Sequence, residues 1–498
     1  MRNIKAVSNK YWRGFIMISL AKLSRKIGLG FRPSESFEID PTDWIEAQLG
    51  DDFTNKAIKT ITSTDPPIVD WPKELDFGLT ERVNRLVTLR GIKDRLQEDK
   101  VDDVEFIKQQ MQAEKDYSVQ RLDIYKFAHS ASYNKNQVKL RLAHFWLNHF
   151  TVGLKETTGE LIGHYFDEAI YARLSGSFDE MLHGITSHPA MLTYLDNIYN
   201  IGENSRKAKN CGGRSTQGCT FGLNDNLARE LMELHTVSPT RQYTEDDIHN
   251  AAKILAGWGG IFDKPFSPKV SSYWNAYVKS TAEPGLKTVL NFEFQKGSKS
   301  LRSLTDMLAA DKHTRNFLSR KLATHFIGEN VSKEDIAAIA AAWEQSSGDL
   351  PTIHSTVLNL AYKSPIRKFL WPSTWLFQAI RLSGADLFKG YDDLYLETMT
   401  PALRDPDKIL SELGNSFWSE RQPNGYSDRK SDWVSTEHLD RRIRISELIF
   451  RSGNPKLQAE EIAEMHDFSD QTKLLLTKGK RLQDKFVLLL CSPEFMEV

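Results

Sequence analysis

The segment Gln137–Val152 reads QVKLRLAHFWLNHFTV, and its apolar residues cover most of the circumference of a helix. A helix that is apolar on nearly all sides must be buried. Helical periodicity continues along the chain: apolar residues recur at three- and four-residue steps, as at Leu86, Leu89, Ile92 and Leu96. The fold class that this pattern predicts is all-α.

Outside this segment the sequence predicts many more helices and very little sheet. Helices are expected over residues 103–128, 168–183, 189–200, 224–237, 244–257, 301–326, 333–344, 350–362, 371–383, 406–413, 436–450, 459–465 and 472–492. Strand-like alternation is confined to Tyr273–Val278 and Thr288–Phe294, which predict a minor β-hairpin. We expect a large multi-helix domain with either a single core or two lobes.

The same reading suggests an organisation in four parts. Residues 1–17 form an N-terminal extension, and 18–260 form a first helical lobe that carries the densest polar motif. Residues 261–300, rich in Pro, Ser and Gly, are read as an irregular insertion or hairpin, and 301–498 as a second helical lobe. Long irregular connections of this kind tend to be functional or mobile.

Composition excludes several classes of protein. The 498 residues include 65 Lys and Arg against 66 Asp and Glu, a net charge of −1, so nucleic acid is not expected as a partner. No stretch approaches the ~20 apolar residues of a transmembrane helix, so no transmembrane anchor is expected. The short apolar run Phe15–Ala21 meets Lys22 without a cleavage site, which favours a cytoplasmic location.

The chain contains three cysteines, Cys211, Cys219 and Cys491. So few, in an odd number, suit a reducing compartment. The alternative is that Cys211 and Cys219 pair across the glycine-rich loop between them.

The densest polar motif is NDNLARELMELHT, residues 224–236, which we call the signature segment. Arg229 and Glu233 are four residues apart, and Glu230 and Glu233 three apart, so in a helix they share a face. Two close carboxylates beside Arg229 and His235 are suited to acid/base chemistry or to part of a metal site. The alternative interpretation is a solvated helix face with an Arg–Glu ion pair.

A second group of polar residues lies inside the apolar segment, at His144, Asn148 and His149. Buried polar groups need partners. These residues are either satisfied core histidines with an asparagine bonded to a neighbouring loop, or Asn148 and His149 serve a site. Trp258 belongs to a set of aromatic residues that either stack on sugar rings or simply pack.

The signature segment and the residues that follow it, NDNLARELMELHTVSPTRQYTEDDIHNAAKILAGWG, resemble the signature of the DUF1800 family. Similar to further family elements are SLAKLSRKIGLGFRPSE, LAHFWLNHF, HPAMLTYLDN, LTDMLAADKHTRNFLSRKLATHFIGE, TWLFQAIRLSGA and QPNGYSDRKSDWVS. The resemblance spans about residues 18–497. The chain departs from the family pattern at Ser238, at Ala282–Lys287 and at Arg367. The residues that match the family's core are Asn148, His149, Asp196, Asn197, Asn224, Asn226, Arg229, Glu230, Glu233 and His235.

The resemblance implies a residue set rather than a reaction, because the family is named for lacking an assigned function. Its members are often bacterial, often exported and often encoded beside sulfatase-like proteins. This implies work on an envelope or extracellular polymer, with a carbohydrate polymer or a sulfatase-like protein as partner. It also leaves an exported or periplasmic location open.

Three functional hypotheses follow. The first is a hydrolase or lyase acting on a polysaccharide: Glu230 and Glu233 are the acid/base candidates, held by Arg229, with His235 or His149 as proton shuttle. Substrate would be bound by Asn148, Asn224, Asn226, Asp196 and Trp258. The second is a divalent metal held by Glu230, Glu233, His235 and either His144 or His149. The third is a non-catalytic binding or assembly module with an interior hydrogen-bond network.

Overall fold

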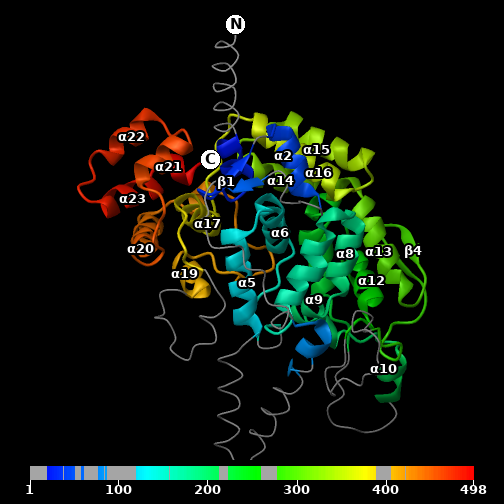
Figure 1. Ribbon diagram of the computed structural model, residues 1–498. Helices are drawn as coiled ribbons and strands as arrows, with labels where there is room; N and C mark the ends of the chain where they lie inside the picture. The colour runs from blue at the N-terminus through cyan, green and yellow to red at the C-terminus, as the bar shows by residue number, and fades with distance from the viewer. Residues whose placement is uncertain are drawn as a thin grey trace, which may run out of the picture.

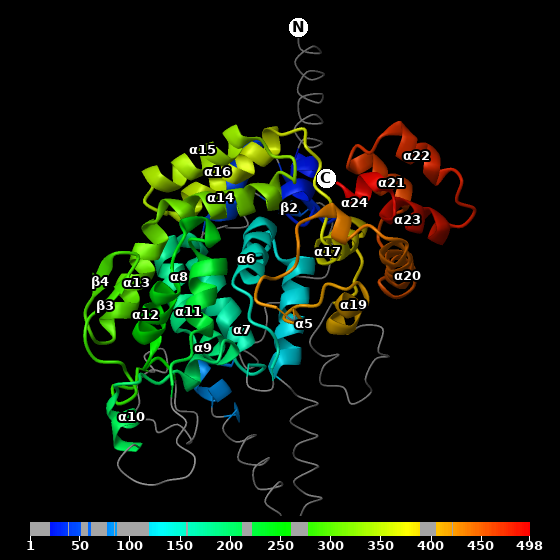
Figure 2. The same cartoon turned by 180° about the vertical axis from the view of Figure 1, so that it is seen from behind.

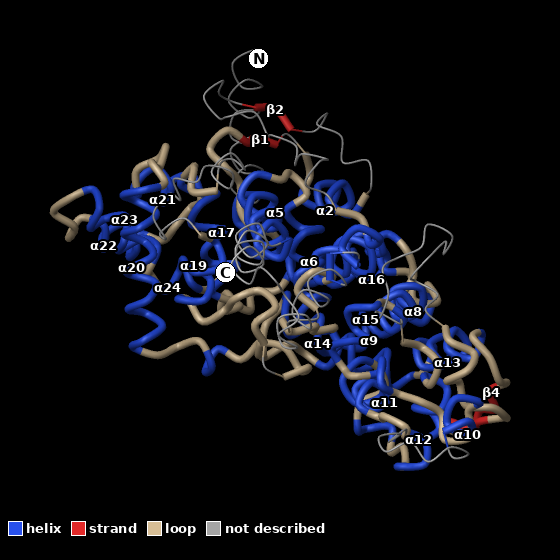
Figure 3. The backbone as a smooth tube through the Cα atoms, turned by 90° about the horizontal axis from the view of Figure 1, so that it is seen from below, coloured by secondary structure: helices blue, strands red, loops and turns tan. Residues whose placement is uncertain are grey.

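The computed structural model describes residues 20–37, 39–50, 58–60, 77–83, 85–86, 119–155, 158–211, 222–259, 277–388, 405–420 and 422–498. Within these ranges helices dominate, and the all-α prediction is confirmed (Figure 1). The short strands lie at the periphery of the molecule (Figure 3). None of the described helices has both the length and the apolarity needed to cross a membrane.

The α-helices follow one another along the whole described chain. They are α2 (Pro41–Leu49), α5 (Val119–Tyr133), α6 (Gln137–His149), α7 (Ile162–His164), α8 (Phe178–Ser187), α9 (Pro189–Tyr194), α10 (Arg206–Cys211), α11 (Asn226–Glu230), α12 (Glu245–Leu255), α13 (Lys299–Ala310), α14 (Lys312–Phe326), α15 (Lys333–Gln345), α16 (Leu350–Lys363), α17 (Pro372–Ser383), α19 (Pro406–Glu412), α20 (Thr436–Ser452), α21 (Ala459–Met465), α22 (Asp470–Leu476), α23 (Leu482–Leu490) and α24 (Pro493–Met496).

Several of the helices expected from the sequence are interrupted. The helix expected over 472–492, for example, is α22 followed by α23. The helix expected over 301–326 is two helices, because Asp311 ends α13 and caps α14 by accepting a hydrogen bond from the His313 amide. The helix expected over 168–183 is a π-helical turn, η3 (Tyr165–Ile170), followed by a 3₁₀ turn, η4 (Tyr171–Ser175), and then α8.

The minor hairpin exists, but its strands differ from the expected ones. Strand β3 (Lys287–Val289) pairs antiparallel with β4 (Phe292–Phe294), so the expected strand Thr288–Phe294 folds back on itself. Leu290 and Asn291 at the turn have φ values of 52° and 68°, the left-handed geometry of a tight two-residue hairpin. Of the other expected strand, Tyr277 forms an isolated bridge with Trp258, and residues 273–276 lie outside the described ranges.

A second small sheet was not expected from the sequence. It joins β1 (Glu35–Phe37) to β2 (Ile58–Thr60), with Glu35 opposite Thr60.

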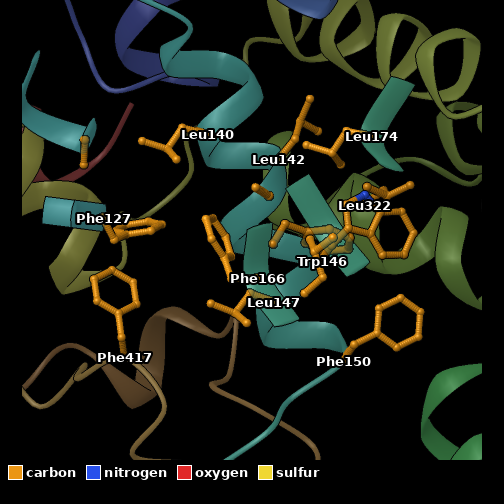
Figure 4. Close-up of a cluster of buried hydrophobic side chains, with 14 of the residues drawn as sticks. Phe127, Leu140, Leu142, Trp146, Leu147, Phe150, Phe166, Leu174, Leu322 and Phe417 are labelled. Carbon is orange, nitrogen blue, oxygen red and sulfur yellow. The ribbon is translucent and has the colours of Figure 1, made fainter. Parts of the chain in front are cut away.

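One hydrophobic core runs through the described residues, from Leu20 to Phe495. Figures 1 and 2 show α5, α6 and α17 in the middle, with α8 to α13 on one side and α20 to α23 on the other. Figure 4 shows the interior around α6, where Phe127 faces Phe417 with a ring-centroid distance of 4.2 Å. The division into lobes at residues 260 and 300 stays a prediction.

Helix α6 is buried along its entire length, as its sequence predicts. Its polar side chains therefore bond to segments on different sides. Arg141 Nη1 donates to the carbonyl oxygens of Arg25, Lys26 and Gly28, at 3.4, 2.6 and 3.2 Å. Trp146 Nε1 donates to His354 Nε2 of α16 at 2.9 Å. Helix α6 thus connects parts of the chain that are far apart in sequence.

Replacing Arg141 by Leu should remove one donor from three carbonyl groups. Gln378 Nε2 still donates to those of Arg25 and Gly28, whereas the Lys26 carbonyl loses its side-chain donor. We expect the free energy of unfolding to fall by about 1–3 kcal/mol, because an acceptor that loses its partner carries a desolvation cost. Chemical denaturation measures the change. Arg320→Leu, at an exposed position of α14, is the matched control and should change stability by less than about 0.5 kcal/mol. An equal effect of both substitutions would contradict the role of Arg141.

Candidate active site

The signature segment forms α11 and then changes into a π-helical turn, η6 (Leu231–His235). Asn224 Oδ1 begins the helix by accepting a hydrogen bond from the Asn226 amide at 3.1 Å. At the other end, the Ser238 amide donates to the Met232 carbonyl at 2.9 Å, and Thr236 Oγ1 donates to the Leu231 carbonyl at 2.6 Å. Single π-helical turns inside α-helices are frequent at functional sites.

Arg229 does not pair with Glu233, although their spacing allows it. Its Nη2 lies 2.9 Å from Asp225 Oδ2 and 2.9 Å from Glu245 Oε2. These carboxylates raise the pKa of the Arg229 guanidinium. The expectation that Arg229 holds a signature carboxylate by a direct ion pair is therefore corrected: the side chain links α11 to the first turn of α12.

Glu230 and Glu233, the signature carboxylates, are both half-buried. Among the described residues, neither side chain makes a hydrogen bond or an ion pair that fixes its charge. Burial is the largest cause that raises the pKa of Glu230, and the neighbouring charge of Glu233 raises it further, while Arg229 lowers it. Glu230 therefore holds a proton to higher pH than an exposed glutamate does.

Two further side chains of this region were missed by the sequence analysis, Tyr194 of α9 and Glu420. Burial raises the pKa of Tyr194 to about 12, and the charges of Glu420 and then Glu230 contribute to this shift. Burial also raises the pKa of Glu420 to about 7. Glu420 and Glu230, from segments far apart in the chain, thus both lie within electrostatic reach of the Tyr194 hydroxyl.

Sequence signals for these two residues existed but did not single them out. Tyr194 lies within HPAMLTYLDN, two residues before Asp196, and Glu420 begins a charge-rich stretch. Only packing places them near Glu230: the Leu154 amide donates to the Trp418 carbonyl, and Gly153 approaches both Glu420 and the Tyr194 ring. A β-carbon at Gly153 would lie 2.9 Å from the Glu420 carbonyl oxygen.

His149 is buried, and both of its ring nitrogens are engaged. Its Nε2 lies 3.1 Å from the His235 carbonyl oxygen, which can only accept, so Nε2 carries the hydrogen. Lys321 Nζ of α14 then donates to Nδ1 at 2.9 Å. Burial, together with the charge of Lys321, lowers the pKa of His149 well below its ordinary value. His149 is thus a neutral connection between α6, η6 and α14.

His235 is buried too, and burial lowers its pKa to about 3. Among the described residues, its ring nitrogens have no hydrogen-bond partner. His235 is therefore neutral at physiological pH and lies behind the signature carboxylates in the core rather than at the surface.

Asn148 uses its side-chain amide on the backbone of one loop residue. Its Nδ2 donates to the Tyr426 carbonyl at 3.0 Å, and its Oδ1 accepts from the Tyr426 amide at 2.7 Å. Close by, Asp428 Oδ1 lies 2.9 Å from His325 Nδ1 and 2.9 Å from Lys368 Nζ. His325 and Lys368 hold the pKa of Asp428 below its usual range against the effect of burial.

Hydrogen bonds link three further asparagines next to the signature segment, Asn197, Asn200 and Asn224. Asn200 Oδ1 accepts from the Asn224 amide, Asn200 Nδ2 donates to Asn197 Oδ1, and Asn197 Nδ2 donates to the Trp258 carbonyl. Trp258 itself is buried and packs on Tyr277, with a ring-centroid distance of 5.5 Å. These side chains position the backbone around the signature segment.

Of the residues expected to bind substrate, Asn226 is exposed, and Asp196 and Asn224 are half-buried. Asp196 has a left-handed backbone, with φ of 58°, and its carboxylate lies 4.0 Å from Lys155 Nζ. Lys155 Nζ also donates to the Tyr194 carbonyl at 2.6 Å. Asp196 and Lys155 thus border Tyr194, whereas Asn226 is exposed at the start of α11.

The histidine and carboxylate groups suggested for a metal are not gathered together. Across the described ranges, no three His, Cys, Asp or Glu side chains are placed so that they could share a metal ion. His144, one of the two alternative ligands, packs against Trp371 and Phe417, and burial lowers its pKa to about 3. Cys491 is a free thiol, and Cys219 lies outside the described residues.

The buried Lys321 ammonium makes a pH-dependent contribution to stability. Burial lowers the pKa of Lys321 to about 8 from 10.5, so between these values the unfolded chain binds more protons and unfolding becomes harder as pH rises. We compare the free energies of unfolding of wild type and Lys321→Met at pH 7 and pH 10. The free energy of unfolding of the wild type, relative to that of Lys321→Met, should be higher at pH 10 than at pH 7. A difference independent of pH would contradict a charged, buried Lys321.

Comparisons with known proteins agree with the resemblance seen in the sequence. Searches among curated proteins and among solved structures gave no match. A family model described as "Protein of unknown function (DUF1800)" matches residues 22–497, nearly the whole chain. This range includes α6, the signature segment and the polar side chains that link them. The chain therefore belongs to the DUF1800 family.

Proposed function

We propose that this protein is an acid/base enzyme, a hydrolase or lyase acting on a polysaccharide or another envelope polymer. One observation carries the proposal: Glu230 and Glu420 come from separate segments, both have a raised pKa, and both influence the Tyr194 hydroxyl. A carboxyl group with a pKa near the working pH is suited to donate a proton in a transition state. Two carboxyl groups in different environments can divide the roles of acid and base.

Glu420 is the better general acid of the two. Its pKa of about 7 leaves a substantial fraction protonated at neutral pH, so it can protonate a leaving oxygen. Glu230, whose pKa is raised by burial and lowered in part by the charge of Arg229, then accepts a proton from water or from the substrate. Glu233 increases the basicity of Glu230 through its charge.

The roles of the remaining shortlisted residues follow from their contacts. His149 and His235 are buried and neutral, so in this proposal they position η6 rather than shuttle protons. Asp196 and Asn226 reach solvent beside Tyr194 and α11, and are proposed to contact the polymer. Asn148 holds the backbone of Tyr426, while the backbones of Asn224 and Trp258 are themselves held by Asn200 and Asn197.

Glu230→Gln and Glu420→Gln should each lower turnover by about 10²–10⁴-fold, the usual contribution of a positioned acid or base. The assay incubates the protein with a neutral glucan, a polyuronate and peptidoglycan sacculi. Reducing ends report hydrolysis, and absorbance of the unsaturated product reports elimination. Glu334→Gln, at an exposed position of α15, is the control and should keep full activity. Full activity in both site variants would contradict the proposal.

The pH dependence of turnover tests the division of roles. Because the acid must be protonated and the base ionised, the rate should fall as pH rises through about 7 and fall again at acidic pH, where Glu230 takes up its proton. The residual activity of Glu420→Gln should lose the alkaline limb. A variant that keeps this limb would show that another group is the acid.

The second candidate is a non-catalytic binding or assembly module, favoured by a specific observation. Most of the hydrogen bonds in this region join side chains to backbone groups, as at Asn148, Asn197, Asn200 and His149. Such a network specifies one packing arrangement without any reaction. The double variant Glu230→Gln/Glu233→Gln separates the candidates: a module should change in stability with no loss of turnover or of cellular phenotype.

A further inference from the structure

A second cavity, far from the signature segment in the sequence, lies where the beginning and the end of the described chain meet. Its volume is about 330 Å³. The helical residues 20–27 form one wall, and α24 with the residues around His466 forms another. Arg25 Nη2 joins the two walls by donating to the Glu494 carbonyl at 2.9 Å. Figures 1 and 2 both show the C-terminus beside the first described segment.

The carboxylates around this cavity already have partners. Asp467 forms an ion pair with Lys22, with 2.6 Å between Oδ2 and Nζ. Glu494 Oε2 accepts hydrogen bonds from the Ser469 amide at 3.0 Å and from Thr472 Oγ1 at 2.6 Å. Glu497 forms an ion pair with Lys430. Asp467 and Glu497 are thus each neutralised by a lysine, whereas Glu494 has only neutral hydrogen-bond donors and its charge acts on Arg25.

Three cationic side chains of the cavity lack such a carboxylate partner. Arg25 is only 5% exposed, and its Nε has no hydrogen-bond partner among the described residues. Lys26 Nζ donates to the Ser364 carbonyl at 2.5 Å and forms no ion pair within the described ranges. Arg367 is exposed on the segment after α16, and its guanidinium likewise has no partner in the described part of the chain.

Burial lowers the pKa values of two of these cationic groups. Burial lowers the pKa of Lys26 to about 8. Burial lowers the pKa of Arg25 to about 10, with Glu494 opposing this effect and Arg367 adding to it. In addition, the first 34 residues contain eight Lys or Arg and no Asp or Glu, so this part of the sequence offers no compensating carboxylate. A cavity with such unmatched cations attracts anions.

We propose that this cavity binds a phosphate monoester of a small polyol or sugar. Lys26 Nζ and the Arg367 guanidinium supply charge-assisted hydrogen bonds to the phosphate oxygens, and the buried Arg25 guanidinium adds positive charge in the wall. Two cationic donor groups at one cavity suit a phosphate dianion better than a single carboxylate. The volume is at the lower end of the range for ligand sites, and the hydroxyl groups of Tyr362 and Ser364 line it, which suits a small polar body.

The test is isothermal titration of the full chain with inorganic phosphate and with glycerol 3-phosphate, at constant ionic strength set with chloride. Wild type should bind glycerol 3-phosphate more tightly than inorganic phosphate. Arg367→Ala and Lys26→Gln should each weaken binding by at least about tenfold, since hydrogen bonds to charged groups contribute about 1.5–3 kcal/mol. Lys363→Ala is the matched control, because Lys363 is exposed four residues before Arg367 but does not line the cavity.

A vesicle arm identifies the source of the phosphate. Binding to phosphatidic acid vesicles that is lost in Arg367→Ala, with no binding of soluble glycerol 3-phosphate, would assign the site to a lipid headgroup with the same phosphate chemistry. No phosphate binding by the wild type in either form would overturn the proposal. Equal dissociation constants for wild type, Arg367→Ala and Lys26→Gln would overturn it as well. Thermal melting of each variant confirms that it is folded.

Discussion

The complete burial of α6 is the constraint on which the rest of the structure depends. A helix surrounded by protein cannot leave its polar side chains to water, so each must find a partner in whatever segment packs on that side. Arg141 therefore bonds to residues 25–28, Trp146 to α16, Asn148 to the loop at Tyr426 and His149 to the end of η6. Buried hydrogen bonds of this kind fix the relative positions of segments that are distant in sequence.

This constraint also separates two kinds of residue in the polar motifs. The asparagines and His149 have partners in the interior and position the backbone, whereas Glu230, Glu233 and Glu420 keep carboxyl groups whose charges no described ion pair neutralises. Glu230 and Glu420, whose pKa values burial raises, are therefore candidates for chemistry. Glu230 ends α11 and Glu233 lies in η6, where the helix changes from α to π geometry.

The two proposed sites draw on different features of the fold. The acid/base site depends on packing in the middle of the chain, where Gly153 lets the Glu420 segment approach Tyr194. The phosphate site depends on the meeting of the first and last described segments, where Arg25 is held between the rings of Phe468 and Phe495 at 4.5 and 5.3 Å. In the acid/base site, the low local dielectric favours the neutral form of the carboxyl groups. In the phosphate site, it strengthens the attraction between the cations and an anion.

The sequence by itself determined the all-α class, the buried α6 and the membership of the DUF1800 family, because periodicity and motifs are local properties. It also brought Glu230 and Glu233 together, since residues three apart on a helix are neighbours. Tertiary structure alone decided that Arg229 turns to Glu245, that His149 is locked between Lys321 and His235, and that Glu420 approaches Tyr194. Each of these contacts joins segments whose separation in sequence carries no local signal, so only packing of the core could select them.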